Sequence, residues 1–127
     1  QMGYSLVRLL QGLGSLQEPE LAAFEQLEEP AFPTVYAGIA WYWQIDMQDA
    51  MHAYAWSWLE NQASAAMKTV PLGQVAGQKL LLTLGAALPQ LISHAMTLPE
   101  EEISNFCPAL SIAGCRHETQ YTRLFRS

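Results

Sequence analysis

Hydrophobic residues recur at helical spacing from the start of the chain. Four leucines stand at positions i, i+3, i+4 and i+7, and a glycine follows at the place of a helix C-cap. These residues are Leu6, Leu9, Leu10, Leu13 and Gly14. The spacing predicts a first helix that ends at the glycine.

Residues 15–33 interrupt this pattern with three prolines and five glutamates. We expect an acidic connector here, holding at most a short helix around Leu21, Phe24 and Leu27. Because charged segments with several prolines bury little apolar surface, the connector should be mobile and solvated.

A helix is predicted after Pro33, and Gly38 within it would permit the close approach of a neighbouring segment. Its apolar residues are Val35, Ile39, Tyr42 and Trp43. A longer helix should start at Met47, because Asp46 can accept hydrogen bonds from the amides of its first turn, and run to about Thr69.

Five of the polar side chains of this long helix fall within about 100° of arc on a helical wheel. They belong to Asp49, Ser57, Glu60, Ser64 and Lys68, while Met51, Tyr54, Trp58, Gln62 and Ala65 lie mostly opposite. Most of the circumference is therefore apolar or small, which is typical of the central helix of a bundle.

Shorter helices are predicted beyond Pro71, which should end or kink the long helix. Leucines at positions 80, 81, 84 and 88 form a core stripe, Pro89 begins another helical segment, and the last helix runs from Pro108 to about Tyr121. Residues 80–99 lack Asp, Glu, Lys and Arg, but polar and helix-breaking residues interrupt them. We interpret them as buried helices and not as a membrane span.

The whole pattern favours one fold class. No segment shows the alternation of apolar and polar residues that marks a strand. We predict an all-α fold, a single domain over residues 1–127 formed by an irregular bundle of about six helices without a sheet.

Composition narrows the classes of function. The net charge of -6, with only six Lys and Arg, argues against nucleic-acid binding, which needs clustered cations. Half of the residues are hydrophobic and only 14% are charged, so part of the apolar surface should meet another chain or an absent segment. Two cysteines make no dense disulfide framework and no signal sequence opens the chain, so we expect a cytoplasmic protein.

Candidate chemistry is sparse. His117-Glu118 lacks the second histidine of a zinc protease motif, because position 121 is tyrosine. Cys107, Cys115 and His117 match no common zinc-ligand spacing, so we interpret the cysteines as ordinary buried residues. The four tryptophans are expected in the core or in an interface, with an aromatic ligand pocket as the alternative. No catalytic, cofactor-binding or metal-binding residue is predicted.

Two segments carry candidate partner-binding residues. Lys68 precedes a Pro-Leu-Gly-Gln turn, where a solvated stripe and a contact with an acidic or phosphate-bearing partner both remain open. Residues 116–127 hold three of the six basic residues of this acidic chain, together with aromatic side chains. Arginine and aromatic residues are enriched at interface hot spots, so we favour a docked tail over a frayed one.

Three stretches resemble the family of the urease accessory protein UreF. They are Ala55 to Asn61, Lys68 to Gln74 with Gly77-Gln78 following, and above all Arg116 to Ser127. Family members are longer at the N-terminus, so the chain is similar to the C-terminal part of a family sequence, and this fits its abrupt start at Gln1.

The resemblance implies an all-α protein that is not an enzyme and needs no cofactor. UreF-like proteins bind UreD, called UreH in some organisms, and recruit the GTPase UreG for nickel insertion into apo-urease in the cytoplasm. The expected partner-binding residues are Lys68, Pro71, Gly73, Gln74, Arg116, His117, Glu118, Tyr121, Arg123, Phe125 and Arg126. A homodimer is also compatible with the sequence.

Two other hypotheses stay open beside this adaptor. An arginine of the tail, Arg123 or Arg126, could act in trans on the bound GTPase as an arginine finger. Alternatively, the tryptophans could belong to a helical domain that binds a small molecule.

Overall fold

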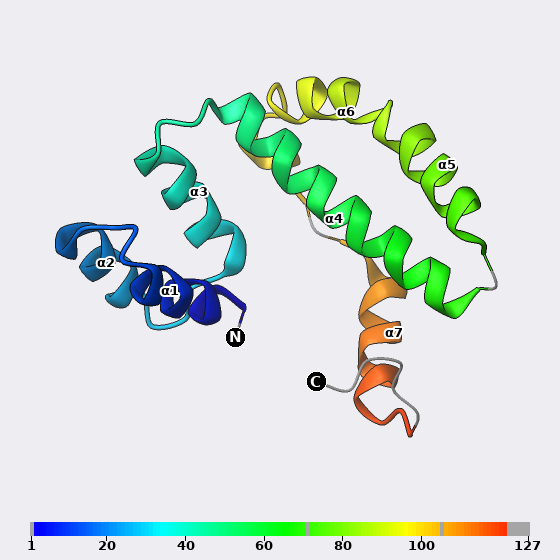
Figure 1. The fold of residues 1–127 in the computed structure, drawn as a ribbon, viewed down its shortest axis with the longest axis horizontal. Helices are drawn as coiled ribbons and strands as arrows, with labels where there is room; N and C mark the ends of the chain where they lie inside the picture. The colour runs from blue at the N-terminus through cyan, green and yellow to red at the C-terminus, as the bar shows by residue number, and fades with distance from the viewer. Residues whose placement is uncertain (1, 71, 105, 122–127) are drawn as a thin grey trace. The chain divides into compact units, whose positions relative to one another are not determined.

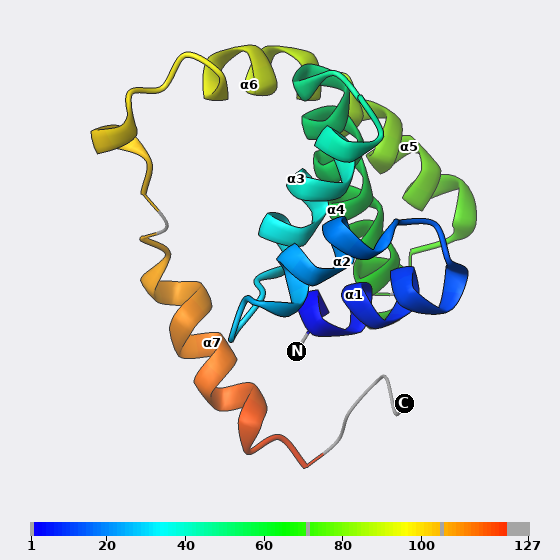
Figure 2. The ribbon, with the colours of Figure 1, turned by 90° about the vertical axis from the view of Figure 1, so that its left-hand side faces the viewer.

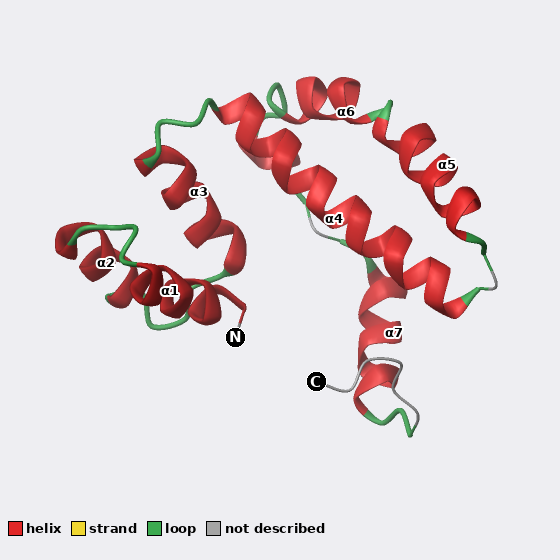
Figure 3. Cartoon of the chain, in the orientation of Figure 1, coloured by secondary structure: helices red, strands yellow, loops and turns green. Residues whose placement is uncertain are grey.

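Helices form the regular structure of the chain. The computed structural model describes residues 2–70, 72–104 and 106–121, and these residues contain no strand (Figure 3). The helices are α1 (Met2–Leu13), α2 (Glu18–Glu25), α3 (Phe32–Tyr42), α4 (Met47–Thr69), α5 (Gln74–Gly85), α6 (Leu88–Ala95), the 3-10 helix η1 (Glu100–Glu102) and α7 (Pro108–Glu118) (Figure 1). The predicted all-α fold class is therefore confirmed.

The chain divides into two compact units, residues 1–51 and residues 52–127. Each unit is described by itself below. The expectation of a single domain over residues 1–127 stays a prediction.

The first unit is built around α1, which packs against both α2 and α3. Its buried cluster consists of Val7, Leu10, Leu16, Val35 and Ile39. Of the predicted leucine stripe, Leu10 is buried and Leu6 packs on the cluster, whereas Leu9 and Leu13 are exposed. Gly14 follows the helix with φ of 59°, a left-handed conformation that glycine adopts without steric cost, so the predicted C-cap is confirmed.

The connector over residues 15–33 is less solvated than its composition predicts. Leu16 is buried, and Leu21 and Phe24 pack against the core of the first unit. The expectation of a solvated connector is therefore wrong for these side chains, because α2 presents its apolar side to α1 and α3. The close approach predicted at Gly38 is confirmed, since a Cβ there would lie 2.6 Å from the ring of Phe24.

The link between α3 and α4 is a defined turn. Gln44 has φ of 56°, and the Ile45 amide donates to the Ala40 carbonyl at 2.9 Å, which is the bond that closes a Schellman motif. At the start of α4 the Gln48 amide donates to Oδ1 of Asp46 at 2.8 Å, which confirms the predicted cap.

In the second unit, α4 and α5 form an antiparallel hairpin, and the two helices lie side by side in both views (Figure 1, Figure 2). Leu59, Ala63 and Leu81 are its buried cluster, and Leu88 packs against them. Met67 of α4 fills the space beside Gly77 of α5. At the other end of the hairpin, a Cβ on Gly85 would lie 2.6 Å from Cζ3 of Trp56, so two glycines allow the helices to approach.

This packing corrects the predicted role of the long helix. The start at Met47 and the end at Thr69 are as predicted. The side that meets α5 carries Leu59 and Ala63, whereas Trp58, predicted on the apolar side, is 60% exposed. Among the described residues α4 is thus covered on one side by α5 and is not a fully enclosed helix.

The apolar stretch Gln74–Ala95 is also more exposed than predicted. By length and composition alone it could cross a membrane, which for one stretch is weak evidence, and only 17% of its most apolar window is buried. The chain turns at Ala86 and Ala87, so the stretch is divided between α5 and α6. The interpretation of residues 80–99 as buried helices is wrong for most side chains, because α4 covers only one side of α5.

The last helix, α7, starts at Pro108 as predicted and ends at Glu118, close to the predicted end. Every described residue from 99 to 121 is exposed. The helix therefore contributes nothing to the buried cluster of the second unit.

Candidate functional site

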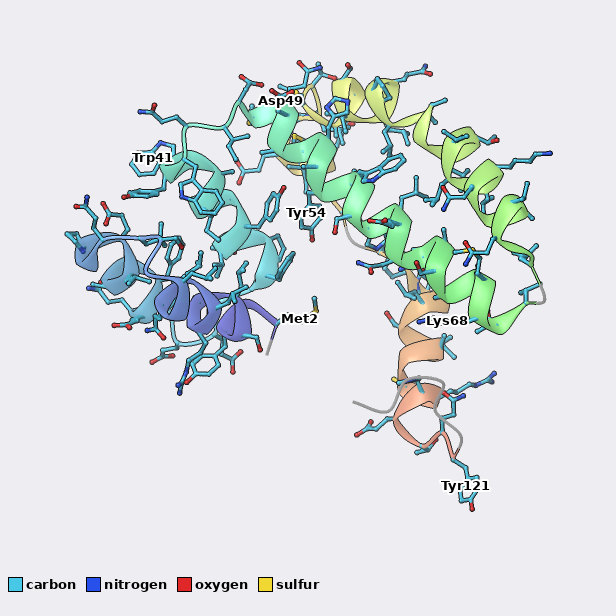
Figure 4. The ribbon with its side chains drawn as sticks, in the orientation of Figure 1. Met2, Trp41, Asp49, Tyr54, Lys68 and Tyr121 are labelled. Carbon is cyan, nitrogen blue, oxygen red and sulfur yellow. The ribbon has the colours of Figure 1, made fainter. Side chains whose placement is uncertain are left out.

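The first candidate segment, residues 68–74, forms the tip of the hairpin between α4 and α5. Lys68 is exposed in the last turn of α4 (Figure 4). Gly73 is the N-cap of α5, with extended φ and ψ of -67° and 158°, and Gln74 is the first residue of that helix. Pro71 lies outside the described residues.

Local hydrogen bonds hold the tip on its described sides. The Thr69 hydroxyl donates to the carbonyl of Ala65 at 2.9 Å, and the Val70 amide donates to the Ala66 carbonyl at 2.8 Å. On the other side, the Gly77 amide donates to the carbonyl of Gly73 at 3.1 Å. These bonds satisfy backbone groups that helix ends leave free, and they fix where Lys68 and the start of α5 stand.

The second candidate segment begins in the last turn of α7. Arg116, His117 and Glu118 are all exposed there, and Tyr121 is 99% exposed (Figure 4). The Gln120 amide donates to the carbonyl of His117 at 3.2 Å, which closes the end of the helix. Arg123, Phe125 and Arg126 lie outside the described residues, so the arginine-finger hypothesis stays a prediction.

The positions of these cations have a structural explanation as well. Lys68 stands in the last turn of α4, and Arg116 stands in the last turn of α7. Cations at the C-terminal end of a helix are stabilised by the helix dipole, typically by about 0.3–1 kcal/mol at exposed positions. Their location alone does not demand a partner, but their exposure leaves them accessible to one.

The cysteines differ from their predicted environment. Cys107 and Cys115 are both free thiols and both exposed, so their interpretation as buried residues is wrong. They are exposed because α7 packs on no other described part of the second unit's core. In the part of the chain that the structure describes, no three His, Cys, Asp or Glu side chains gather in a group suited to a metal ion.

Tryptophan positions bear on the ligand-pocket hypothesis. All four, Trp41, Trp43, Trp56 and Trp58, are exposed, so they do not form a core in this structure, and the other part of the expectation, a place in an interface, stays a prediction. A surface hollow in the first unit is lined by Met2, Ser5, Leu6, Leu9 and Phe32. Because its lining contains no tryptophan, it gives no support to an aromatic ligand pocket.

One surface was missed by the reading of periodicity. Four large hydrophobic residues at the α3–α4 link are exposed and form what we call the junction patch, namely Trp41, Trp43, Ile45 and Met47. Trp43 had been assigned to the apolar side of its helix. The signal available in the sequence is the absence of Lys and Arg from residues 9–67, which leaves this apolar cluster among carboxylates only.

A sequence model of the UreF family matches residues 1–85. The chain belongs to the UreF family. It is 61% identical over its whole length to the urease accessory protein UreF of Methylobacillus flagellatus, of which it covers 56%. It is 56% identical to the UreF protein of Azoarcus sp. strain BH72, covering 55%, and 53% identical to that of Dechloromonas aromatica, covering 56%.

These matches confirm the family expected from the three sequence stretches. The chain spans just over half the length of the curated relatives that it matches. Its placement in the C-terminal part of a UreF family sequence stays a prediction.

Proposed function

We propose that the chain is the partner-binding part of a urease accessory protein, a helical adaptor and not an enzyme. In this proposal it binds UreD, or UreH, and recruits the GTPase UreG to apo-urease in the cytoplasm. The nickel ion that the assembly inserts is cargo, and the adaptor contributes protein contacts. The observation that carries the proposal is the match, over the whole chain, to relatives named urease accessory protein UreF.

The exposure of α7 supports a role in binding. A helix with no buried residue gains little from tertiary packing, although packing is the main source of helix stability in proteins. Exposed apolar side chains of this segment include Ile103, Phe106, Leu110 and Ile112. A partner surface that covers them would supply the missing burial, at roughly 25 cal/mol per Å² of apolar area removed from water.

The end of α7 would add specificity to that contact. The Arg116 guanidinium can donate two parallel hydrogen bonds to one carboxylate, which a lysine cannot match in geometry. Tyr121 adds a large aromatic surface with a polar tip, a combination enriched at interface hot spots. Both side chains are exposed and therefore available to UreD.

Removal of the segment tests the proposal. We expect a chain that ends at Ala113 to lose capture by immobilised UreD at least tenfold, because α7 loses its last turn and the 116–127 segment together. Circular dichroism would check that the remaining helices are retained. Capture of the shortened chain with unchanged affinity would sink the proposed contact.

Point variants separate the contact from a general loss of structure. We expect Arg116→Ala and Tyr121→Ala each to weaken capture, because both side chains are exposed and can be removed without disturbing the buried clusters. Glu101→Gln, another exposed residue of the same unit, is the matched control and should bind UreD as the unaltered chain does.

A further inference from the structure

The junction patch brings several exposed apolar side chains into a short segment of the first unit. The exposed fractions are 80% for Trp41, 50% for Trp43, 44% for Ile45 and 63% for Met47. Scattered exposed hydrophobic residues are normal, but four large ones within seven consecutive residues are a concentration of apolar side chains of the kind that marks an interaction site. Figure 4 labels Trp41, the most exposed tryptophan, at the C-terminal end of α3.

The backbone beneath the patch is held by several bonds. Three amides at the end of α3 donate back into the helix: Trp43 to Ile39 at 2.9 Å, Gln44 to Trp41 at 3.0 Å and Ile45 to Ala40 at 2.9 Å. The Asp46 side chain caps α4, and the Tyr36 hydroxyl donates to the Ala50 carbonyl at 3.2 Å, which ties α3 to the first turn of α4. The patch is therefore presented on an ordered turn, which lowers the entropy lost on binding.

The turn also contains a disfavoured conformation. Gln44 is the only non-glycine residue with positive φ in the described part of the chain. A left-handed residue with a Cβ costs of the order of 1–2 kcal/mol and persists where its surroundings impose it, which is typical of binding surfaces. Here that conformation separates Trp43 from Ile45 and turns the chain between two exposed hydrophobic pairs.

Charge selects among partners. Residues 1–51 contain seven carboxylate side chains and one arginine, so their formal charge is -7 + 1 = -6. Asp46, between Ile45 and Met47, and Asp49, two residues after Met47, are both exposed, and Figure 4 labels Asp49 in the first turn of α4. An apolar centre with an acidic rim is complementary to an apolar surface with a basic rim.

We propose that the junction patch docks an amphipathic helix of another protein, whose apolar stripe covers the tryptophans and whose flanking Lys or Arg residues meet Asp46 and Asp49. A helix is the favoured occupant because the patch lies between the end of α3 and the start of α4, and the described residues of this unit contain no strand whose edge could pair with an extended peptide. The inference does not rest on the proposed adaptor function, which uses the segments at 68–74 and 116–127.

Titration with model peptides tests this inference. The probe is a fluorescent 18-residue helical peptide of leucine and lysine with one apolar face, added to the 127-residue chain. A second peptide carries glutamate in place of every lysine, and a third scrambles the leucines so that no stripe remains. We expect the lysine peptide to bind at least about tenfold more tightly than either of the others, equivalent to about 1.4 kcal/mol.

Paired variants locate the binding on the patch. Trp41→Ser should weaken binding of the lysine peptide at least about tenfold, as expected for a hot-spot tryptophan. Trp58→Ser, also at an exposed tryptophan but in the second unit, should change it less than about twofold. Asp46→Asn with Asp49→Asn should weaken it several-fold while asparagine keeps the cap of α4, and Glu28→Gln with Glu29→Gln is the charge-matched control.

Several results would overturn the proposal. Equal affinity for the lysine and glutamate peptides would show that the acidic residues do not select the partner. Equal losses of affinity in Trp41→Ser and Trp58→Ser would show that the peptide does not bind at the junction patch. Concentration-dependent association of the chain with itself, abolished by Trp41→Ser, would identify a second copy as the occupant instead. If Trp41→Ser loses helicity, the double variant Asp46→Asn with Asp49→Asn decides, because it leaves the apolar residues of the patch intact. Unchanged affinity of this double variant for the lysine peptide would then contradict the proposal.

Discussion

Two helices of this chain end at a residue with a left-handed backbone conformation, and the two residues differ in type. Gly14 and Gln44 both end a helix with positive φ, 59° and 56°. Only glycine adopts this conformation without crowding of a Cβ, so the two C-caps differ in intrinsic cost although their geometry is similar.

Gln44→Gly should therefore stabilise the first unit. The expected gain is about 0.5–1 kcal/mol in the free energy of unfolding, less the entropy that a glycine adds to the unfolded chain. Urea denaturation followed by circular dichroism measures it. Ala37→Gly, at an exposed position within α3, is the matched control substitution by glycine. It should instead lower the free energy of unfolding by about 1 kcal/mol. A loss of stability in Gln44→Gly would show that the glutamine side chain itself holds the turn.

Thiol reactivity offers a second test at this scale. Because Cys107 and Cys115 are both exposed, a thiol reagent should titrate two groups per chain without denaturant. The same count in denaturant is the control. If fewer than two thiols react before unfolding, the exposure of α7 in this structure is contradicted.

Residue-level prediction from the sequence succeeded where the physics is local. The Gly14 cap, the Asp46 cap and the close approach at Gly38 depend on neighbours in sequence or on the absence of one side chain. Trp43 and Trp58 were assigned to apolar sides, and both are exposed. Periodicity identifies which residues share a side of a helix. Whether that side is buried depends on another element that packs against it.

At the scale of elements, the α4–α5 hairpin shows which residues determine the side on which two helices pack. Gly77, Leu81 and Gly85 recur every four residues along α5, and the two glycines leave room for Met67 and the ring of Trp56. Sequence reading placed both helix bounds of α4, yet it favoured a different buried side. A helical wheel does not register that a side chain on one helix will fill the space left by a glycine on another.

Gly85→Ala tests this packing. Alanine is the better helix former by about 1 kcal/mol, but its Cβ would lie 2.6 Å from Trp56, so the ring or the helix must move. We expect a net loss of about 1–3 kcal/mol in the free energy of unfolding, measured by urea denaturation.

The control for this variant is Gly114→Ala in α7, where a Cβ meets nothing within 4 Å. It should raise helicity and leave the unfolding of the hairpin unchanged. A double variant in which Trp56→Leu accompanies Gly85→Ala should recover part of the loss, because the crowded ring is gone. Stabilisation by Gly85→Ala alone would contradict the close packing.

For the whole molecule, sequence reasoning reached the fold class and the family but not the distribution of exposed surface. The helical spacing and the stretch from Arg116 to Ser127 are carried by the chain itself, and they were sufficient for both conclusions. Whether an apolar side of a helix is buried also depends on segments and partner chains outside these 127 residues. The chain spans just over half the length of its relatives, and α5 and α6 expose apolar side chains that helical periodicity predicted to be buried.

The exposure of α7 determines how fast its amide hydrogens exchange with solvent. Isolated helices shorter than about 12–15 residues are marginal in water, and α7 has 11 residues and no buried side chain. Its amide hydrogens should exchange with solvent within seconds, far faster than those of Leu59 and Ala63 in α4. Docking on a partner would then slow exchange in α7 first, so the same amides that are least protected in the free chain become the most direct reporters of its assembly.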